Sequence, residues 1–174
     1  GLGIYLAEGS RNRKPKITNS EPLIINQAIK FFELIGVRKK RLKAWIQLHE
    51  RSTKSFDKVK EFWLENTNLN KSNITKIRIK KSTGNAKIKE YGTLHLESSF
   101  VLSQLLMKNL LELIPSILEQ LLDEQIIYFL QGAYAGEGHV GLAKSGSVNM
   151  VGYTTTNKKE RDMIRVLLEK LSFK

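Results

Sequence analysis

The alternation of apolar and polar residues predicts three β-strands in the first part of the chain. Residues 42–49, 76–80 and 93–97 carry aliphatic side chains at every second position, with mostly basic or hydrogen-bonding residues between them. Alternate side chains of a strand point to opposite faces of a sheet. The three segments therefore predict an antiparallel sheet with an aliphatic back and a basic, hydrogen-bonding front. Residues 82–87 are mostly polar and predict a hairpin connection between the last two strands.

Apolar residues at helical spacing predict the helices of the chain. One helix is expected to begin with Ser20 as its N-cap residue, to carry Pro22 in its first turn and to end at Gly36. Further helices are expected over residues 55–65, from Ser99 to an interruption at Pro115, over residues 116–122, over residues 124–137 and after Asn157, which forms a capping box with Glu160. The aromatic and leucine side chains of these helices are expected to form the core.

A short pattern occurs twice in the chain, at residues 1–9 and at residues 130–138. Both copies have the order Gly-x-Tyr-x-small-Glu-Gly. The small residues of each copy are four positions apart, so they lie on one face of a helix, where they let two backbones approach closely. They are Gly3 and Ala7 in the first copy, and Gly132 and Gly136 in the second.

Each copy of the pattern ends in an acid followed by a glycine. Gly9 and Gly138 suit the left-handed residue that follows many helices, which would place Glu8 and Glu137 in the last helical turn. A carboxylate is unfavourable there because the helix end carries partial negative charge. Either copy alone is typical of a structural helix end, but two equivalent acids suggest that a cation offsets their repulsion. Oxygen ligands without His or Cys favour Mg²⁺, or Mn²⁺.

The two segments resemble the LAGLIDADG motif of homing endonucleases when they are aligned on the final acid-glycine pair. Glu8 and Glu137 take the place of the terminal Asp of the motif, and Leu6 and Ala135 replace its inner acid. The resemblance implies an α+β fold of αββαββα type, in which the two motif helices pack together at the centre of a pseudo-dimer. It also implies that Glu8 and Glu137 bind the divalent metals that cut both strands of a DNA duplex.

The order of the first half restarts after Glu137. Residues 139–144 and 148–155 suit two strands around a turn at residues 145–147, and a helix follows. Counterparts of the three strands described above are missing. The pattern therefore predicts two pseudo-symmetric halves, residues 1–123 and 124–174, of which the second is shortened, as in a fragment or a shortened relative. Such a molecule is expected to be a monomer with internal pseudo-symmetry or to be completed by another chain.

Composition narrows the possible partners. The chain has 29 Lys and Arg against 17 Asp and Glu, a formal net charge of +12, which favours nucleic acid. The sequence contains no cysteine, which excludes a disulfide framework and the usual zinc knuckles. No apolar run is long enough to cross a membrane. A first residue other than Met suggests a trimmed N-terminus, and the absence of a visible signal peptide agrees with a cytoplasmic or nucleoid location, or an organelle matrix.

The candidate DNA contacts lie in the basic run after the first motif, on the sheet front and on the last two strands. They are Arg11, Arg13, Lys14, Lys16, Lys43, Trp45, Gln47, Lys76, Arg78, Lys80, His95, Lys144, Asn149 and Tyr153. The resembled family commonly uses a lysine near each metal site, and Lys43 and Lys80 are the candidates for this catalytic role.

Two other functions fit the same scaffold. One is a LAGLIDADG-derived regulator that binds duplex DNA without cutting it. The other is a maturase that binds intron RNA. His49, His95 and His139 could act in catalysis, although a surface or DNA-contacting role is the simpler interpretation.

Overall fold

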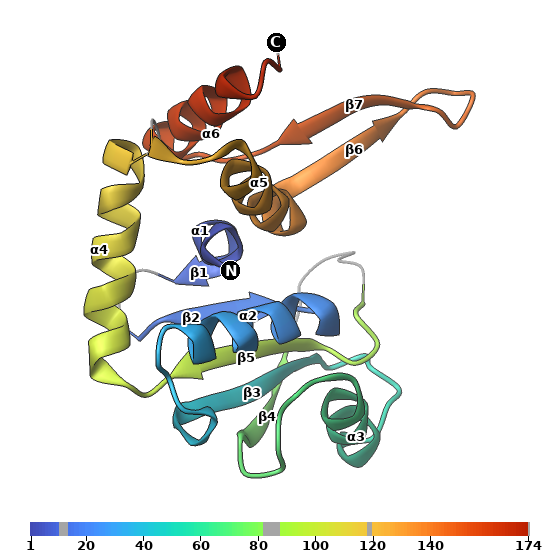
Figure 1. Cartoon of the computed structure of the whole chain (residues 1–174). Coiled ribbons are helices and arrows are strands. Elements are labelled where there is room, and N and C mark those ends of the chain that lie inside the picture. The colour runs from blue at the N-terminus through green and yellow to red at the C-terminus, as the bar shows by residue number, and fades with distance from the viewer. Residues whose placement is uncertain (11–13, 82–87, 118–119, 174) are drawn as a thin grey trace. The chain divides into compact units, whose positions relative to one another are not determined.

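The structure, a computed structural model, describes residues 1–10, 14–81, 88–117 and 120–173 (Figure 1). It divides into two compact units. The helix-pair unit comprises Gly1–Glu8 and Lys108–Lys174, and the sheet unit comprises Gly9–Met107. The units cut across the two halves expected from the sequence, because the first motif helix packs with the second.

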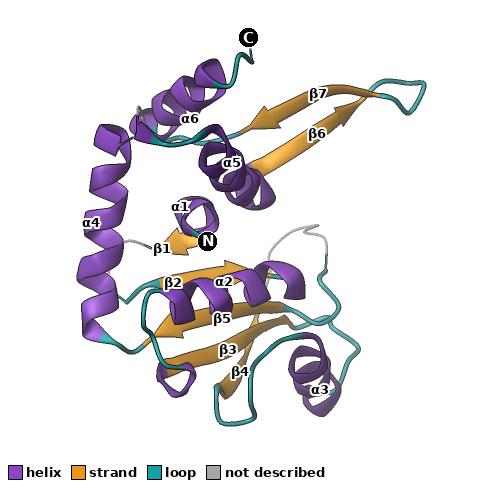
Figure 2. Cartoon of the chain, viewed as in Figure 1, coloured by secondary structure: helices purple, strands orange, loops and turns teal. Residues whose placement is uncertain are grey.

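The chain is of the α+β class, with helices and two sheets along its length (Figure 2). The sheet unit contains β1 (Gly9–Ser10), β2 (Lys16–Asn19), α2 (Pro22–Leu34), a 3-10 turn (Lys39–Arg41), β3 (Leu42–His49), α3 (Phe56–Asn66), β4 (Ile74–Lys80), β5 (Thr93–Ser98) and the start of α4 (Val101–Ile117). The helix-pair unit contains α1 (Leu2–Glu8), the rest of α4, α5 (Asp123–Glu137), β6 (Gly138–Leu142), β7 (Val148–Tyr153) and α6 (Lys158–Lys170). None of the helices within the described residues has the length and apolar character needed to cross a bilayer.

The three predicted strands form in the sheet unit, but their order differs from the prediction. The sheet has the order β1-β2-β5-β3-β4, and β4 runs parallel to β3 while the other neighbours are antiparallel. The predicted hairpin between β4 and β5 is therefore wrong, since β3 lies between these strands. A parallel neighbour requires a crossover, which α3 supplies. Residues 82–87 themselves lie outside the described residues.

The aliphatic back of the sheet forms the core of this unit. All four inward positions of β3 are at most 2% exposed, and Leu94 and Leu96 of β5 are fully buried. Helix α2 contributes Ile25, Ala28, Ile29 and Phe32 to the core, and it lies along the sheet in Figure 1. Ile79 of β4 is predicted to lie on the buried back of the sheet, but its side chain is 49% exposed, because β4 is an edge strand.

The start of α2 is capped by a different residue from the predicted one. Glu21 occupies the N-cap position and Pro22 begins the helix. The side chain of Asn19, rather than that of Ser20, accepts the Glu21 N–H at 2.8 Å. Gly36 ends the helical segment as predicted, with a left-handed φ of 86°.

The helix-pair unit is built around a core of apolar residues from α1, α4, α5 and α6. Its buried members are Leu6, Ile114, Ile126, Leu130, Ala133, Met163, Ile164 and Leu167. Pro115 is expected from the sequence to interrupt or start a helix, but it lies inside α4, near its end, and it removes one backbone hydrogen bond there. The Lys170 ammonium donates to the Leu121 carbonyl at 2.9 Å and so ties α6 to the segment that precedes α5.

The predicted turn at residues 145–147 joins β6 and β7 into an antiparallel hairpin, with Gly146 at φ 83°. Asn157 caps α6 as predicted, since its side chain accepts the Glu160 N–H at 3.4 Å. The Glu160 carboxylate accepts the hydroxyl of Tyr153 at 2.5 Å, which anchors the end of β7 to α6. The outer part of the hairpin is exposed, Val140, Leu142 and Val151 among its residues.

Candidate functional site

The small residues of the two motifs lie where α1 and α5 meet. A Cβ placed on Gly3 would lie 2.0 Å from the Phe129 carbonyl oxygen, and one on Gly132 would lie 3.0 Å from the Ile4 nitrogen. A Cβ on Gly136 would lie 2.7 Å from the Ala7 Cβ. The two backbones therefore approach closely enough that larger residues at Gly3 or Gly136 would collide with the opposite helix.

This contact brings the two acidic ends of the motifs together. A Cβ on Gly136 would lie 2.8 Å from Cγ of Glu8, so the Glu8 side chain fills the space that this glycine leaves. Glu137 directly follows Gly136 and is the last residue of α5, as Glu8 is of α1. Neither helix has a basic residue in its last turn. Both carboxylates therefore sit at negative helix ends.

The glycines that follow the two acids do not adopt the predicted left-handed conformation. Gly138 has φ −76° and ψ 151° and begins β6 directly after α5, and Gly9 begins β1 in the same way. A glycine is nevertheless required at position 138, because a Cβ there would lie 2.3 Å from the Tyr134 carbonyl oxygen. Close approach to the preceding turn, and not a positive φ, explains this residue.

The donor set at the helix ends fits a hard divalent cation. Within the described residues no three His, Cys, Asp or Glu side chains gather as a metal site. The carboxylates at the ends of the two motif helices are those of Glu8 and Glu137. Mg²⁺ commonly binds one or two carboxylates and completes its shell with water and substrate phosphates. The Glu8 side chain lies against Gly136, the residue that precedes Glu137.

The front of the sheet in the sheet unit carries the second candidate surface. Strand register places Trp45 between His95 of β5 and Lys76 of β4, and it pairs Gln47 with Arg78 and His49 with Lys80. Basic residues line this face, namely Lys16, Lys43, Lys76, Arg78 and Lys80. Lys43 also reaches the Ser72 carbonyl at 3.4 Å. Four of these five are exposed, and Lys16 is half-buried.

A stacked group of side chains occupies the middle of this front. The rings of Trp45 and His95 are parallel within 3° and 3.6 Å apart. The Trp45 Nε1–H donates to Glu97 at 3.1 Å, and the guanidinium of Arg78 lies 4.7 Å from the Trp45 ring centre. The ring nitrogen Nδ1 of His95 is hydrogen-bonded to the Thr18 hydroxyl at 2.9 Å.

His95 is held in its neutral form by this environment. Burial, and then the charges of Lys16 and Arg78, lower the pKa of His95 from 6.5 to about 4. Its Nε2 atom is buried without a hydrogen-bond partner. His95 is 7% exposed, so it supports the side chains around it more directly than it presents itself to a ligand.

The remaining candidate residues are spread over both units. Arg11 and Arg13 lie outside the described residues, and Lys14 is exposed before β2. Lys144 in the β6–β7 turn and Asn149 on β7 are exposed in the helix-pair unit. Tyr153 packs against Tyr134 and donates to Glu160, which gives it a structural role. DNA contacts by these residues, and catalytic assistance by Lys43 and Lys80, stay predictions.

Sequence reasoning missed Thr18, and it placed Glu97 on the front without a role. The sequence holds a signal for the role of Glu97, because this residue is the one acid among the front positions of the three predicted strands. Its carboxylate binds the Trp45 indole, which explains an acid on a basic face. Thr18 offered no comparable signal, because its role depends on the pairing of β2 with β5.

Comparison with known protein families agrees with this picture. Residues 124–174, which hold α5, β6, β7 and α6, match the family described as LAGLIDADG-like domain. This similarity of residues 124–174 confirms the predicted resemblance, and the helices and sheets of the structure confirm the α+β class. Comparisons with curated proteins and with solved structures give no significant match.

Proposed function

We propose that this protein binds duplex DNA and cuts it by metal-dependent phosphodiester hydrolysis, in the manner of LAGLIDADG homing endonucleases. The observation that carries the proposal is the α1–α5 contact, in which the Glu8 side chain lies against Gly136, next to Glu137. Two carboxylates at adjoining helix ends repel each other and the helix dipoles. Carboxylate oxygens are also the ligands that Mg²⁺ prefers.

In this proposal Glu8 and Glu137 hold Mg²⁺ or Mn²⁺ with one carboxylate from each motif. When bound, such ions activate water and stabilise the leaving oxygen of a phosphodiester. The carboxylates orient the ions at the junction of the two helices, where the close backbone approach fixes their separation. Lys43 and Lys80 are the proposed assisting lysines, one on β3 and one at the end of β4.

The sheet front supports a duplex as the ligand. Its lysines and Arg78 would contact phosphates and base edges across a groove. Single-stranded RNA is commonly held by bases stacked on exposed aromatic rings. Trp45, the large aromatic residue of this front, already stacks on His95 and lies under Arg78. This arrangement favours duplex DNA over intron RNA.

A DNA-binding regulator without nuclease activity is the second candidate. It is favoured by the basic front of the sheet unit, which suits a polyanion whether or not Glu8 and Glu137 hold a metal.

Nicking of supercoiled plasmid tests the proposal. The wild type is expected to relax plasmid with Mg²⁺ and to stop when a chelator is added. Glu8→Gln and Glu137→Gln should each slow nicking at least about 100-fold, since loss of a metal ligand removes several kcal/mol of transition-state stabilisation. The matched control is Glu124→Gln, an exposed acid in the first turn of α5, which should stay within about twofold of the wild type.

Binding measured by gel shift without metal separates the candidates. Both Gln variants should bind duplex DNA as the wild type does. A wild type that binds duplex but never nicks would establish the regulator, and stronger binding to structured intron RNA would establish the maturase. Nicking that survives the chelator or both substitutions would refute the assigned metal site.

A further inference from the structure

A row of contacting side chains crosses four strands on the front of the sheet. Thr18 of β2 is hydrogen-bonded to His95 of β5, His95 stacks on Trp45 of β3, and Trp45 lies under Arg78 of β4. The strand order β2-β5-β3-β4 makes each of these contacts one between neighbours. The row ends at an exposed arginine on the edge strand.

The interior of this row is fixed in place. The indole of Trp45 is held at its edge by the Glu97 carboxylate, at 3.1 Å from Nε1, and on one face by the His95 ring at 3.6 Å. The ring of His95 is held by Thr18 at 2.9 Å. Because β3 lies between β5 and β4, His95 and Arg78 approach Trp45 from opposite sides. Both faces of the indole are thus covered.

Arg78 is ordered by stacking and not by an ion pair. Its guanidinium lies 4.7 Å from the Trp45 ring centre, the geometry of a cation–π contact. Within the described part of the chain no carboxylate pairs with it. This contact holds the guanidinium over the ring and leaves its N–H donors available to a ligand. A lysine cannot reproduce this planar fork.

The hydrogen-bond donors of such an arginine match the acceptors of one base, guanine. A guanidinium fork can donate two parallel hydrogen bonds to O6 and N7 of guanine in the major groove. Lys76 and Lys80 lie two residues before and after Arg78 on the same exposed face of β4. Their ammonium groups are point charges that suit phosphates and carry no base preference.

We propose that Arg78 reads one guanine of the target duplex, and that Trp45, His95, Thr18 and Glu97 are positioning residues that hold its guanidinium in the required plane. This inference rests on the proposed binding of duplex DNA and adds a specificity to it. It assigns His95 and Trp45, expected from the sequence to contact DNA, to the support of Arg78. Truncation of Trp45 should then affect the guanine preference more than the overall affinity.

Selection from a randomised duplex library, with the full chain and without divalent metal, tests the inference. The wild type should enrich a motif with a guanine at one position. Arg78→Lys keeps the charge but should reduce the preference for that guanine about tenfold or more, a typical effect of one bidentate contact. Lys76→Ala is the matched control on the same strand, and it should weaken binding to all sequences alike while the motif is kept.

Two variants of Trp45 test the positioning role. Trp45→Leu should reduce the guanine preference as Arg78→Lys does. Trp45→Phe should keep most of this preference, because a ring remains beneath Arg78. A merely structural tryptophan would change the melting temperature without changing the preference at one base pair. If the wild type and Arg78→Lys select the same motif, the inference is overturned, whereas the proposed binding of duplex DNA still stands. A wild type that binds no duplex would overturn the proposed function as well.

Discussion

His95 shows at the scale of one residue how the sheet front is built. A histidine on a strand face that points to solvent would titrate near its usual pKa. Here the ring is buried between Thr18 and Trp45, with Lys16 and Arg78 nearby, and its pKa is lowered to about 4. A neutral imidazole can stack closely on the indole beneath a cationic arginine, whereas a charged one would repel it.

This pKa makes stability depend on pH in a defined direction. The unfolded chain binds the His95 proton near pH 6.5 and the folded chain only near pH 4, so stability from this residue is complete above 6.5 and is lost as pH falls toward 4. The free energy of unfolding, measured by urea titration, should fall more steeply over this interval for the wild type than for His95→Phe. Equal slopes would show that the ring is not held neutral.

The acid that ends the second motif, Glu137, is a second single residue that is expected to affect stability. Glu137 is the last residue of α5, where the helix dipole disfavours a carboxylate. Without divalent metal, Glu137→Gln should therefore be more stable by about 0.3–1 kcal/mol, which raises the melting temperature by roughly 1–4 °C. Mg²⁺ should raise the melting temperature of the wild type more than that of the variant. Thermal scans with and without Mg²⁺ measure both effects, and no gain from Mg²⁺ in either protein would contradict the metal site.

At the scale of elements, helix ends are set by backbone geometry as much as by residue type. Ser20 is a good N-cap residue, yet Glu21 holds that position. The backbone of Glu21 is extended, with φ −103° and ψ 118°, and Pro22 fixes the start of α2 directly after it. The N–H of Glu21 is then within reach of the Asn19 side chain at 2.8 Å.

Substitution at these two positions distinguishes the observed cap from the predicted one. Asn19→Ala should cost about 1 kcal/mol of unfolding free energy, because the Glu21 N–H loses its acceptor. Ser20→Ala is the control and should change stability by less than about 0.5 kcal/mol. Chemical denaturation of the two variants measures both values, and the reverse order would restore Ser20 as the cap.

At the scale of the molecule, basic residues from separate parts of the chain form one surface, because the strands that carry them align in one sheet. Lys43, Lys76, Arg78 and Lys80 come from β3 and β4, and Lys16 from β2, and all five lie on the front of one sheet. Glu97, the acid opposite Lys16 and Lys43, is bonded to the Trp45 indole. The face thus has a net positive charge, which suits a polyanion.

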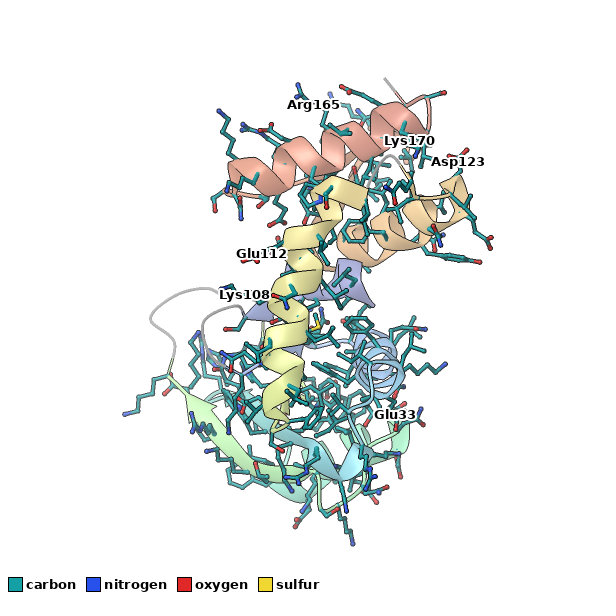
Figure 3. The ribbon with its side chains drawn as sticks, turned by 60° about the vertical axis from the view of Figure 1, so that its left-hand side comes forward. Glu33, Lys108, Glu112, Asp123, Arg165 and Lys170 are labelled. Atoms are coloured by element: carbon teal, nitrogen blue, oxygen red, sulfur yellow. The ribbon has the colours of Figure 1, made fainter. Side chains whose placement is uncertain are left out.

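Binding to duplex DNA should therefore depend steeply on salt. If the five basic residues each neutralise a phosphate, the logarithm of affinity should fall with the logarithm of salt concentration with a slope of about −4 to −5. Lys80→Gln should make this slope shallower by about 0.9. Lys108→Gln, at a lysine paired with Glu112 on α4 (Figure 3), is the control and should leave the slope unchanged. A flat salt response of the wild type would exclude a phosphate-dominated interface.

Much of the architecture follows from short-range pattern. Alternation located β3, β4 and β5, and helical spacing located α2, α3, α5 and α6, because burial of one face imposes a period on the chain. The repeated Gly-x-Tyr-x-small-Glu-Gly pattern indicated the family that residues 124–174 match. These features depend on residues close together in sequence, so they can be predicted from the sequence alone.

Other features depend on which distant segments meet. The sequence shows that 76–80 is a strand, but the placement of β4 parallel to β3, away from β5, depends on the crossover through α3. The row from Thr18 to Arg78 exists only because four strands from separate parts of the chain align in one register. The conformations of Gly9 and Gly138 likewise follow from the strands that begin there. These features become visible only in the folded chain, because hydrogen bonds and ring contacts between remote residues leave no periodic pattern in the sequence.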